Sequence, residues 1–198
     1  MGKVTAGITI SVDGYVAAPD DGPGKGLGEG GERLHYWVFG GPWRYEDEGR
    51  GGGAVGEDAA FLEEATANQG AVICGRNMYE AARHWGDKNP FGVPIFVLTH
   101  TPDDEHEAGE FTFVDGFDSA LERAREAAGE KDVGLAGGAD VIRQGLAAGV
   151  VDELTIIVSP VVLGGGKRLF EGFEQSLDLE QTGIRQSNFA TFISYRVV

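Results

Sequence analysis

The chain has 198 residues, enough for one domain with its own hydrophobic core, and 41% of them are hydrophobic, which excludes a disordered protein. Its formal net charge of −16 at pH 7 disfavours binding to nucleic acid or to an anionic membrane surface, because both are negatively charged. The single cysteine, Cys74, excludes an internal disulfide, and no run of about 18 apolar residues predicts a membrane span, so we expect one soluble cytoplasmic domain over residues 1–198.

The N-terminal part of the chain begins with a predicted strand and continues into two glycine-rich loops. Apolar residues alternate over residues 4–12, as in a strand whose two faces differ. The loops, 19–32 and 44–53, flank an aromatic segment, 33–43, and this arrangement suggests a lid over an active site. The aromatic side chains can stack on a flat heterocycle or, equally, form a hydrophobic plug on the sheet. They are Tyr36, Trp37, Phe39 and Trp43.

Helices and strands alternate through the middle of the chain. Predicted helices cover residues 56–70, 76–85, 118–131 and 139–149. Predicted strands cover residues 71–75, 93–100, 111–114, 133–138, 152–164, 169–173 and 188–198. The alternation predicts a mostly parallel sheet with helices on both faces, and the consecutive closing strands predict an antiparallel addition at one edge. We therefore expect a three-layer α/β/α fold, with Asp118 or Ser119 as the N-cap of the third helix.

Three predicted strands end in small, polar or basic residues. In a parallel sheet such ends lie at one edge, where ligands bind and helix N-termini offer free N–H groups. Arg76 after the first of these strands provides a planar fork for a phosphate. The glycine pair after the third removes side chains where a pyrophosphate could approach the backbone. Taken alone, a glycine pair is more often a structural turn and a single arginine more often a surface charge. The three ends are Gly75-Arg76-Asn77, Thr99-His100 and Gly137-Gly138.

The spacing of residues along the chain disfavours two other kinds of site, a catalytic metal site and a phosphate-binding P-loop. The four histidines form no pair four residues apart, so we expect no catalytic metal. The segment LGGGKRLF, residues 163–170, does not have the glycine-to-lysine spacing of a phosphate-binding P-loop. We interpret it as a connection between strands near the edge of the sheet.

Several segments, in the same order along nearly the whole chain, resemble the dihydrofolate reductase-like superfamily. The similarity is closer to the branch related to the C-terminal reductase domain of the bifunctional riboflavin biosynthesis protein, the RibD C-terminal domain family. The segments that carry it are ITISVDGYVA, VICGRNMYE, IFVLTH, GLAGGADVIRQGL, VDEL and SPVVLGGGKRLF.

The resemblance implies a dihydrofolate reductase-like fold that binds NADPH, and a homodimer formed through the C-terminal strands. Residues implied near the adenosine 2′-phosphate are Gly75, Arg76, Asn77, Met78, Thr99 and His100. Those implied around the pyrophosphate, through backbone N–H groups, are Gly137, Gly138, Ala139, Asp140 and Val141. Those implied at the nicotinamide end are Ser11, Asp13 and Gly14.

The implied activity is hydride transfer from NADPH to a small heterocycle, pterin- or pyrimidine-like, or to a carbonyl compound. This activity is related to that of 5-amino-6-(5-phosphoribosylamino)uracil reductase. Asp58 is the candidate proton donor, although Glu57 lies equally close and either carboxylate can simply stabilise a helix N-terminus. Tyr36, Trp37 and Trp43 are the candidate substrate contacts.

One departure from the riboflavin reductases argues for a different substrate. Those enzymes tend to carry an acidic residue where this chain has Ala136. The alternatives are a non-catalytic NADP(H)-binding dimer that kept the fold, and a purely structural dimer that binds no nucleotide.

Overall fold

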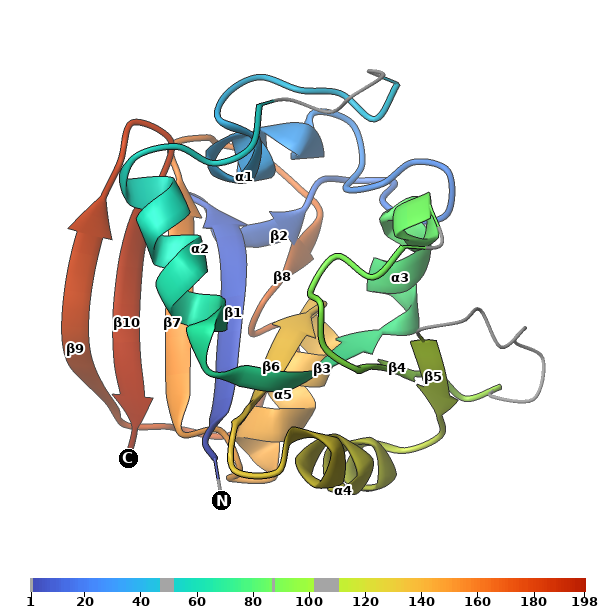
Figure 1. Ribbon diagram of the computed structural model, residues 1–198. Coiled ribbons are helices and arrows are strands. Elements are labelled where there is room, and N and C mark those ends of the chain that lie inside the picture. The colour runs from blue at the N-terminus through green and yellow to red at the C-terminus, as the bar shows by residue number, and fades with distance from the viewer. Residues whose placement is uncertain (1, 47–51, 87, 102–110) are drawn as a thin grey trace.

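The computed structural model describes residues 2–46, 52–86, 88–101 and 111–198. Most of its described strands form one twisted sheet in the order β5-β4-β3-β6-β1-β7-β10-β9 (Figure 1). Strands β5 to β7 along this order pair in parallel, whereas β10 pairs antiparallel with both β7 and β9. The strands are β1 (Val4–Ser11), β3 (Gln69–Gly75), β4 (Ile95–Leu98), β5 (Phe111–Val114), β6 (Asp132–Gly137), β7 (Glu153–Ser159), β9 (Leu179–Gln186) and β10 (Thr191–Val197).

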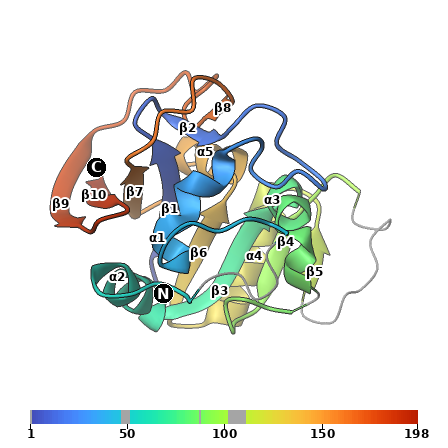
Figure 2. The ribbon, with the colours of Figure 1, turned by 90° about the horizontal axis from the view of Figure 1, so that it is seen from above.

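Helices cover both faces of this sheet. Alternate residues of β1 pack on opposite sides, and Val4, Ala6 and Ile8 join the core beneath α4 and α5. Helices α1, α2 and α3 lie on the other face, and Figure 2 shows β9 and β5 at opposite ends of the sheet. Over the described stretches, no helix has the length and apolar character needed to cross a membrane. The helices are η1 (Gly31–His35), α1 (Tyr36–Phe39), α2 (Glu57–Ala67), α3 (Arg76–Ala81), η2 (Arg83–Gly86), α4 (Phe117–Ala128) and α5 (Ala139–Ala147).

The expected three-layer α/β/α fold with antiparallel edge strands is confirmed. In α4, apolar residues recur every three or four positions and face the sheet, as an amphipathic helix requires. Its N-cap is Gly116 rather than the expected Asp118 or Ser119, because the helix begins at Phe117 and places Asp118 in its first turn. In α5, a Cβ at Gly145 would lie 2.6 Å from Leu135 Cδ1, so glycine permits the close approach of α5 to β6.

The C-terminal third departs from the expectation in two places. Residues 169–173 form no strand; Leu169 is buried in the core and Phe170 is about half exposed. Instead, β8 (Lys167–Arg168) pairs with β2 (Tyr15–Ala17) in a separate two-stranded sheet. Strand β9 was not expected, because nearly all its residues are exposed and its sequence, LEQTGIRQ, has no apolar face.

Candidate active site

A cleft of about 1790 Å³ extends from the ends of β3, β4 and β6 across the face of the sheet that carries α2. It is lined by the predicted residues at all three strand ends, which the parallel pairing brings side by side. The predicted residues that line it are Gly75, Arg76, Asn77, Met78, Thr99, His100, Gly137, Gly138, Ala139, Asp140, Val141, Trp37, Phe39 and Trp43.

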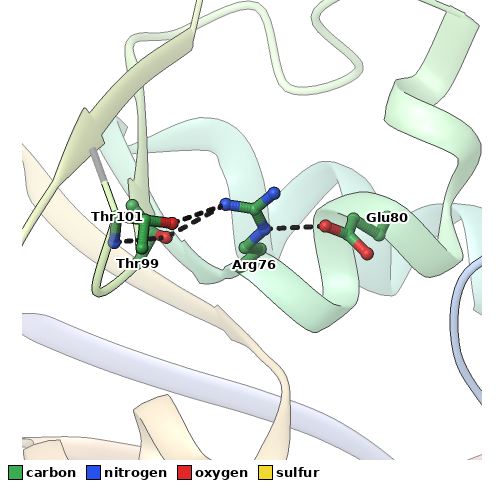
Figure 3. Close-up of polar contacts among 4 residues, drawn as sticks. All are labelled: Arg76, Glu80, Thr99 and Thr101. Carbon is green, nitrogen blue, oxygen red and sulfur yellow. Dashed lines mark hydrogen bonds and ion pairs between the residues drawn. The ribbon is translucent and has the colours of Figure 1, made fainter. Parts of the chain in front are cut away.

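Arg76, the first residue of α3, is held at the ends of β3 and β4 (Figure 3). Its Nε donates to Glu80 Oε1 over 2.7 Å, one helical turn away. Its Nη1 donates to Thr101 Oγ1 over 3.1 Å and to Thr99 Oγ1 over 3.4 Å. The guanidinium is thus oriented by a carboxylate on one side and presented beside two hydroxyl groups on the other. His100, between the threonines, has a fully exposed side chain 3.7 Å from Asp115 Oδ1.

The glycine turn between β6 and α5 leaves its backbone open. Gly137 has a φ of +117°, a conformation that favours glycine, and a Cβ at Gly138 would meet nothing within 4 Å. Asp140, in the first turn of α5, turns along the helix: its carboxylate accepts from Gln144 Nε2 over 2.8 Å and Arg143 Nη2 over 3.3 Å. The N-terminus of α5 therefore presents backbone N–H groups without a carboxylate over them.

Ser11, Asp13 and Gly14 do not line the cleft. They shape the loop between β1 and β2, where Ser11 is fully buried and its Oγ accepts from the Tyr15 N–H. The Asp13 carboxylate accepts from the backbone N–H groups of Leu163 and Gly164, over 3.1 and 2.8 Å. Hydrogen bonds from Ser11 and from these two N–H groups lower the pKa of Asp13 to about 2. In this structure, these residues join two loops.

We expect Asp13→Ala to lower the melting temperature at neutral pH, because it removes three hydrogen bonds to a carboxylate. The pKa of Asp13 is lower in the folded protein than the ordinary value of about 3.9. The stabilisation by its carboxylate is therefore complete above that ordinary value and is lost as the pH falls towards about 2. Thermal unfolding between pH 7 and pH 3 should show that the difference in melting temperature between wild type and Asp13→Ala becomes smaller at low pH. Glu174→Ala, at an exposed position, should show no such pH-dependent difference.

Asp58 lies in the first turn of α2 and is only 1% exposed. Its Oδ1 has no hydrogen-bond partner among the described residues, and the carboxyl does not line the cleft. Burial raises the pKa of Asp58; a hydrogen bond with Ser187 opposes that shift, and the neighbouring charge of Glu57 adds to it. A proton held on this carboxyl would have to reach the cleft past the side chains around it.

Aromatic residues of the segment 33–43 both pack in the core and line the cleft. Tyr36 does not line the cleft. Trp37 lines it, but its ring packs edge-on against Phe61 and Phe192, and its Nε1 donates to Thr9 Oγ1 over 3.1 Å. Trp43 is buried, with its Nε1 bonded to the carbonyl oxygen of Glu32. Residues 47–51 of the expected lid lie outside the described residues.

The structure adds basic and polar residues that sequence reasoning did not place at the site. Lys167 and Arg168, expected in a sheet-edge connection, lie in β8 and line the cleft. Arg143 fixes this segment by donating to the carbonyl oxygens of Arg168 and Leu169. His35 also lines the cleft, and burial lowers its pKa to about 4, so its imidazole is neutral at pH 7. No three His, Cys, Asp or Glu side chains gather as a metal site within the described part of the chain.

Comparison with known proteins identifies the family. Residues 2–190 match the family model of the RibD C-terminal domain. The chain belongs to the RibD C-terminal domain family. It is 26% identical over 198 residues to the "Uncharacterized protein YwjB" of Bacillus subtilis (strain 168), covering 98% of this chain and 97% of that protein.

Solved structures show that this RibD C-terminal domain protein has a dihydrofolate reductase-like fold. A putative riboflavin biosynthesis protein from Shewanella sp. PV-4 is 22% identical, with a TM-score of 0.71 and 99% of each chain covered. Dihydrofolate reductase from Enterococcus faecalis, in complex with NADP(H) and RAB-propyl, is 16% identical, with a TM-score of 0.64 and 99% and 96% covered.

Proposed function

We propose that this RibD C-terminal domain protein is an NADPH-dependent reductase of a small pterin- or pyrimidine-like heterocycle or of a carbonyl compound. The observation that carries the proposal is the Arg76 corner, where an oriented guanidinium and two threonine hydroxyls share one cleft with the open glycine turn. Guanidinium and hydroxyl groups bind a terminal phosphate, and N–H groups at a helix N-terminus bind a pyrophosphate. A dinucleotide with a 2′-phosphate has both groups.

The residues present fit such a cofactor. Arg76, Thr99 and Thr101 would hold the 2′-phosphate, and the backbone N–H groups of Ala139 to Val141 would hold the pyrophosphate. The cleft of about 1790 Å³ exceeds the roughly 300–1,000 Å³ of a typical single-ligand pocket, which leaves room for a substrate beside the cofactor. When bound, NADPH supplies the hydride. The chain's own residues orient both ligands and exclude water between α2, the aromatic segment and the sheet.

Titration of the purified protein with NADPH and NADH, followed by quenching of tryptophan fluorescence, tests this proposal. Trp37, Trp43 and Trp85 all line the cleft and report its occupancy. We expect NADPH to bind in the micromolar range and NADH more weakly, because NADH has no 2′-phosphate for Arg76. Binding of neither nucleotide would contradict the proposed cofactor.

A non-catalytic NADP(H)-binding protein is the second candidate, and the position of Asp58 favours it. The candidate proton donor is buried and does not line the cleft, so the fold can bind nucleotide without carrying a proton to a substrate. NADPH oxidation in the presence of a pterin, pyrimidine or small carbonyl compound distinguishes the two: turnover identifies the reductase.

We also propose a homodimer formed through the C-terminal strands. Strand β9 lies at the edge of the sheet, and Ile184 on it is 58% exposed. An exposed apolar side chain on an unpaired strand edge favours pairing with a second chain. Sedimentation equilibrium measures the mass in solution directly.

A further inference from the structure

Beneath α2, a groove crosses the sheet over a row of small and polar residues. The register pairs Gly7 of β1 with Thr155 of β7, and Thr155 with Ser194 of β10, so these three share one face of the sheet. Thr5 precedes them on the same face of β1 and pairs with Gly134 of β6. We call this row the α2 groove: its floor is Thr5, Gly7, Thr155 and Ser194, its roof is Ala65 and Thr66 of α2, and all six line the cleft.

The groove is open although it lies over the middle of the sheet. Gly7 is exposed in a central strand, and a Cβ there would meet nothing within 4 Å. Helix α2 covers this face in Figures 1 and 2, but only Phe61 and Leu62 of the helix pack against the sheet cluster around Trp37. The later residues of α2, 63–67, are exposed. A flat or extended ligand can therefore lie directly on the β1 backbone.

The floor of the groove is lined with neutral hydrogen-bonding groups. Thr155 Oγ1 and Ser194 Oγ lie 3.3 Å apart, and both residues are only partly buried. The Gln69 amide lies over Gly134, next to Thr5 in the register, and its Oε1 is buried without a hydrogen-bond partner among the described residues. An unpartnered buried acceptor is costly, so rotation of the Gln69 amide towards a hydroxyl group of a ligand in the groove would be favourable.

The lining of the groove carries more carboxylates than cations, whereas the two are nearly balanced at the nucleotide end. Four carboxylates line this part of the cleft; Glu64 is paired with Arg185 and Glu153 with Lys3, and Glu63 and Asp132 leave the charge of the groove negative. At the nucleotide end, Arg76, Arg143, Lys167 and Arg168 lie together with Asp21, Asp140 and Glu171. A phosphate or carboxylate in the groove would be repelled, whereas a neutral group would not. The four carboxylates are Glu63, Glu64, Asp132 and Glu153.

We propose that the α2 groove binds the substrate's side chain, and that this side chain is uncharged and bears hydroxyl groups rather than a phosphate or carboxylate. The proposal rests on the proposed reductase function, because it assigns the substrate of the same cleft. The anionic dinucleotide occupies the end of the cleft that holds Arg76, Arg143 and Arg168, and the neutral polar chain occupies the groove, where carboxylates outnumber cations.

The test compares two matched fluorescent probes on the NADPH-loaded protein. Neopterin is a pterin with an uncharged polyhydroxylated chain, and its monophosphate differs only by the phosphate. We expect neopterin to bind at least about tenfold more tightly, a difference of about 1.4 kcal/mol, because like charges repel in a partly desolvated groove. Equal or tighter binding of the monophosphate, or no binding of either probe to protein that binds NADPH, would overturn the proposal. Failure to bind NADPH would instead count against the cofactor, in a separate titration.

Substitutions in the α2 groove locate the bound probe and test the role of charge. Gly7→Val fills the floor where a Cβ has open space, so we expect neopterin binding to fall about tenfold or more with NADPH binding and melting temperature little changed. Glu63→Lys should reduce the preference for the neutral probe several-fold. The matched control is Glu122→Lys, the same charge change on the exposed face of α4, and it should leave the preference unchanged. Unaltered neopterin binding by Gly7→Val would show that the probe binds elsewhere and would overturn the assignment.

Discussion

Arg76→Ala is expected to weaken NADPH binding by about 10- to 100-fold and NADH binding by about twofold at most. Hydrogen bonds to charged groups contribute about 1.5–3 kcal/mol, and only NADPH has the 2′-phosphate that Arg76 would bind. The side chain is already oriented by Glu80 and lies beside Thr99 and Thr101 (Figure 3), so little ordering is needed on binding. Fluorescence titration with both nucleotides measures the effect.

Two further variants make the Arg76 result specific. Arg123→Ala removes an exposed arginine from α4, outside the cleft, and should leave both affinities unchanged. Arg76→Lys keeps the charge but loses the planar fork, and we expect intermediate binding. An equal loss of NADPH and NADH affinity in Arg76→Ala, with the melting temperature preserved, would mean that Arg76 does not distinguish the two nucleotides.

Asp58→Asn is expected to reduce turnover by about 10²- to 10⁴-fold, the usual contribution of a general acid, if the buried carboxyl donates the proton. NADPH binding should be unchanged, because Asp58 does not line the cleft. Initial rates of NADPH oxidation with an identified substrate measure the effect. Glu57→Gln, at the neighbouring exposed carboxylate, is the matched control. Full turnover by Asp58→Asn would assign the proton to another group.

The same variant is expected to be more stable than wild type at neutral pH. Burial raises the pKa of Asp58 in the folded state, so its contribution to stability is complete below the ordinary value of about 3.9 and is lost as the pH rises through the raised value. Asparagine does not titrate. The difference in free energy of unfolding between the variant and wild type should therefore grow as the pH rises from about 3.9 through the raised pKa, and then level off. Urea unfolding at several pH values between 4 and 8 measures it. A constant difference would contradict a raised pKa.

Most of the sheet could be predicted because its central strands are buried on both faces. Strand β3 is an almost continuous apolar run, and α4 shows a clear helical period, so both are readable from local sequence. Strand β9 could not be predicted in this way, because pairing with β10, and not burial, holds it in place. The prediction of a strand at 169–173 was wrong because Leu169 is buried while it lies in a turn, so its burial does not indicate a strand.

The same distinction between local sequence and long-range contacts applies to the residues of the site. Arg76, Thr99 and the glycine turn were predictable because each directly follows its own strand, and parallel strands end at one edge. The burial of Asp58 depends on contacts with distant parts of the chain, Ser187 among them, and no local pattern encodes them. Lys167 and Arg168 line the cleft because β8 pairs with β2, which precedes it by about 150 residues. Whether the predicted contacts bind nucleotide stays a prediction.

The uneven attachment of α2 has a consequence for motion. Its first two turns are anchored by Phe61 and Leu62, whereas its later residues are exposed and joined to the sheet face by the Glu64–Arg185 ion pair. Backbone amides in such a segment open at low free energy, independently of global unfolding. Local fraying of the last turns of α2 would therefore widen the α2 groove above β1 while the sheet stays paired.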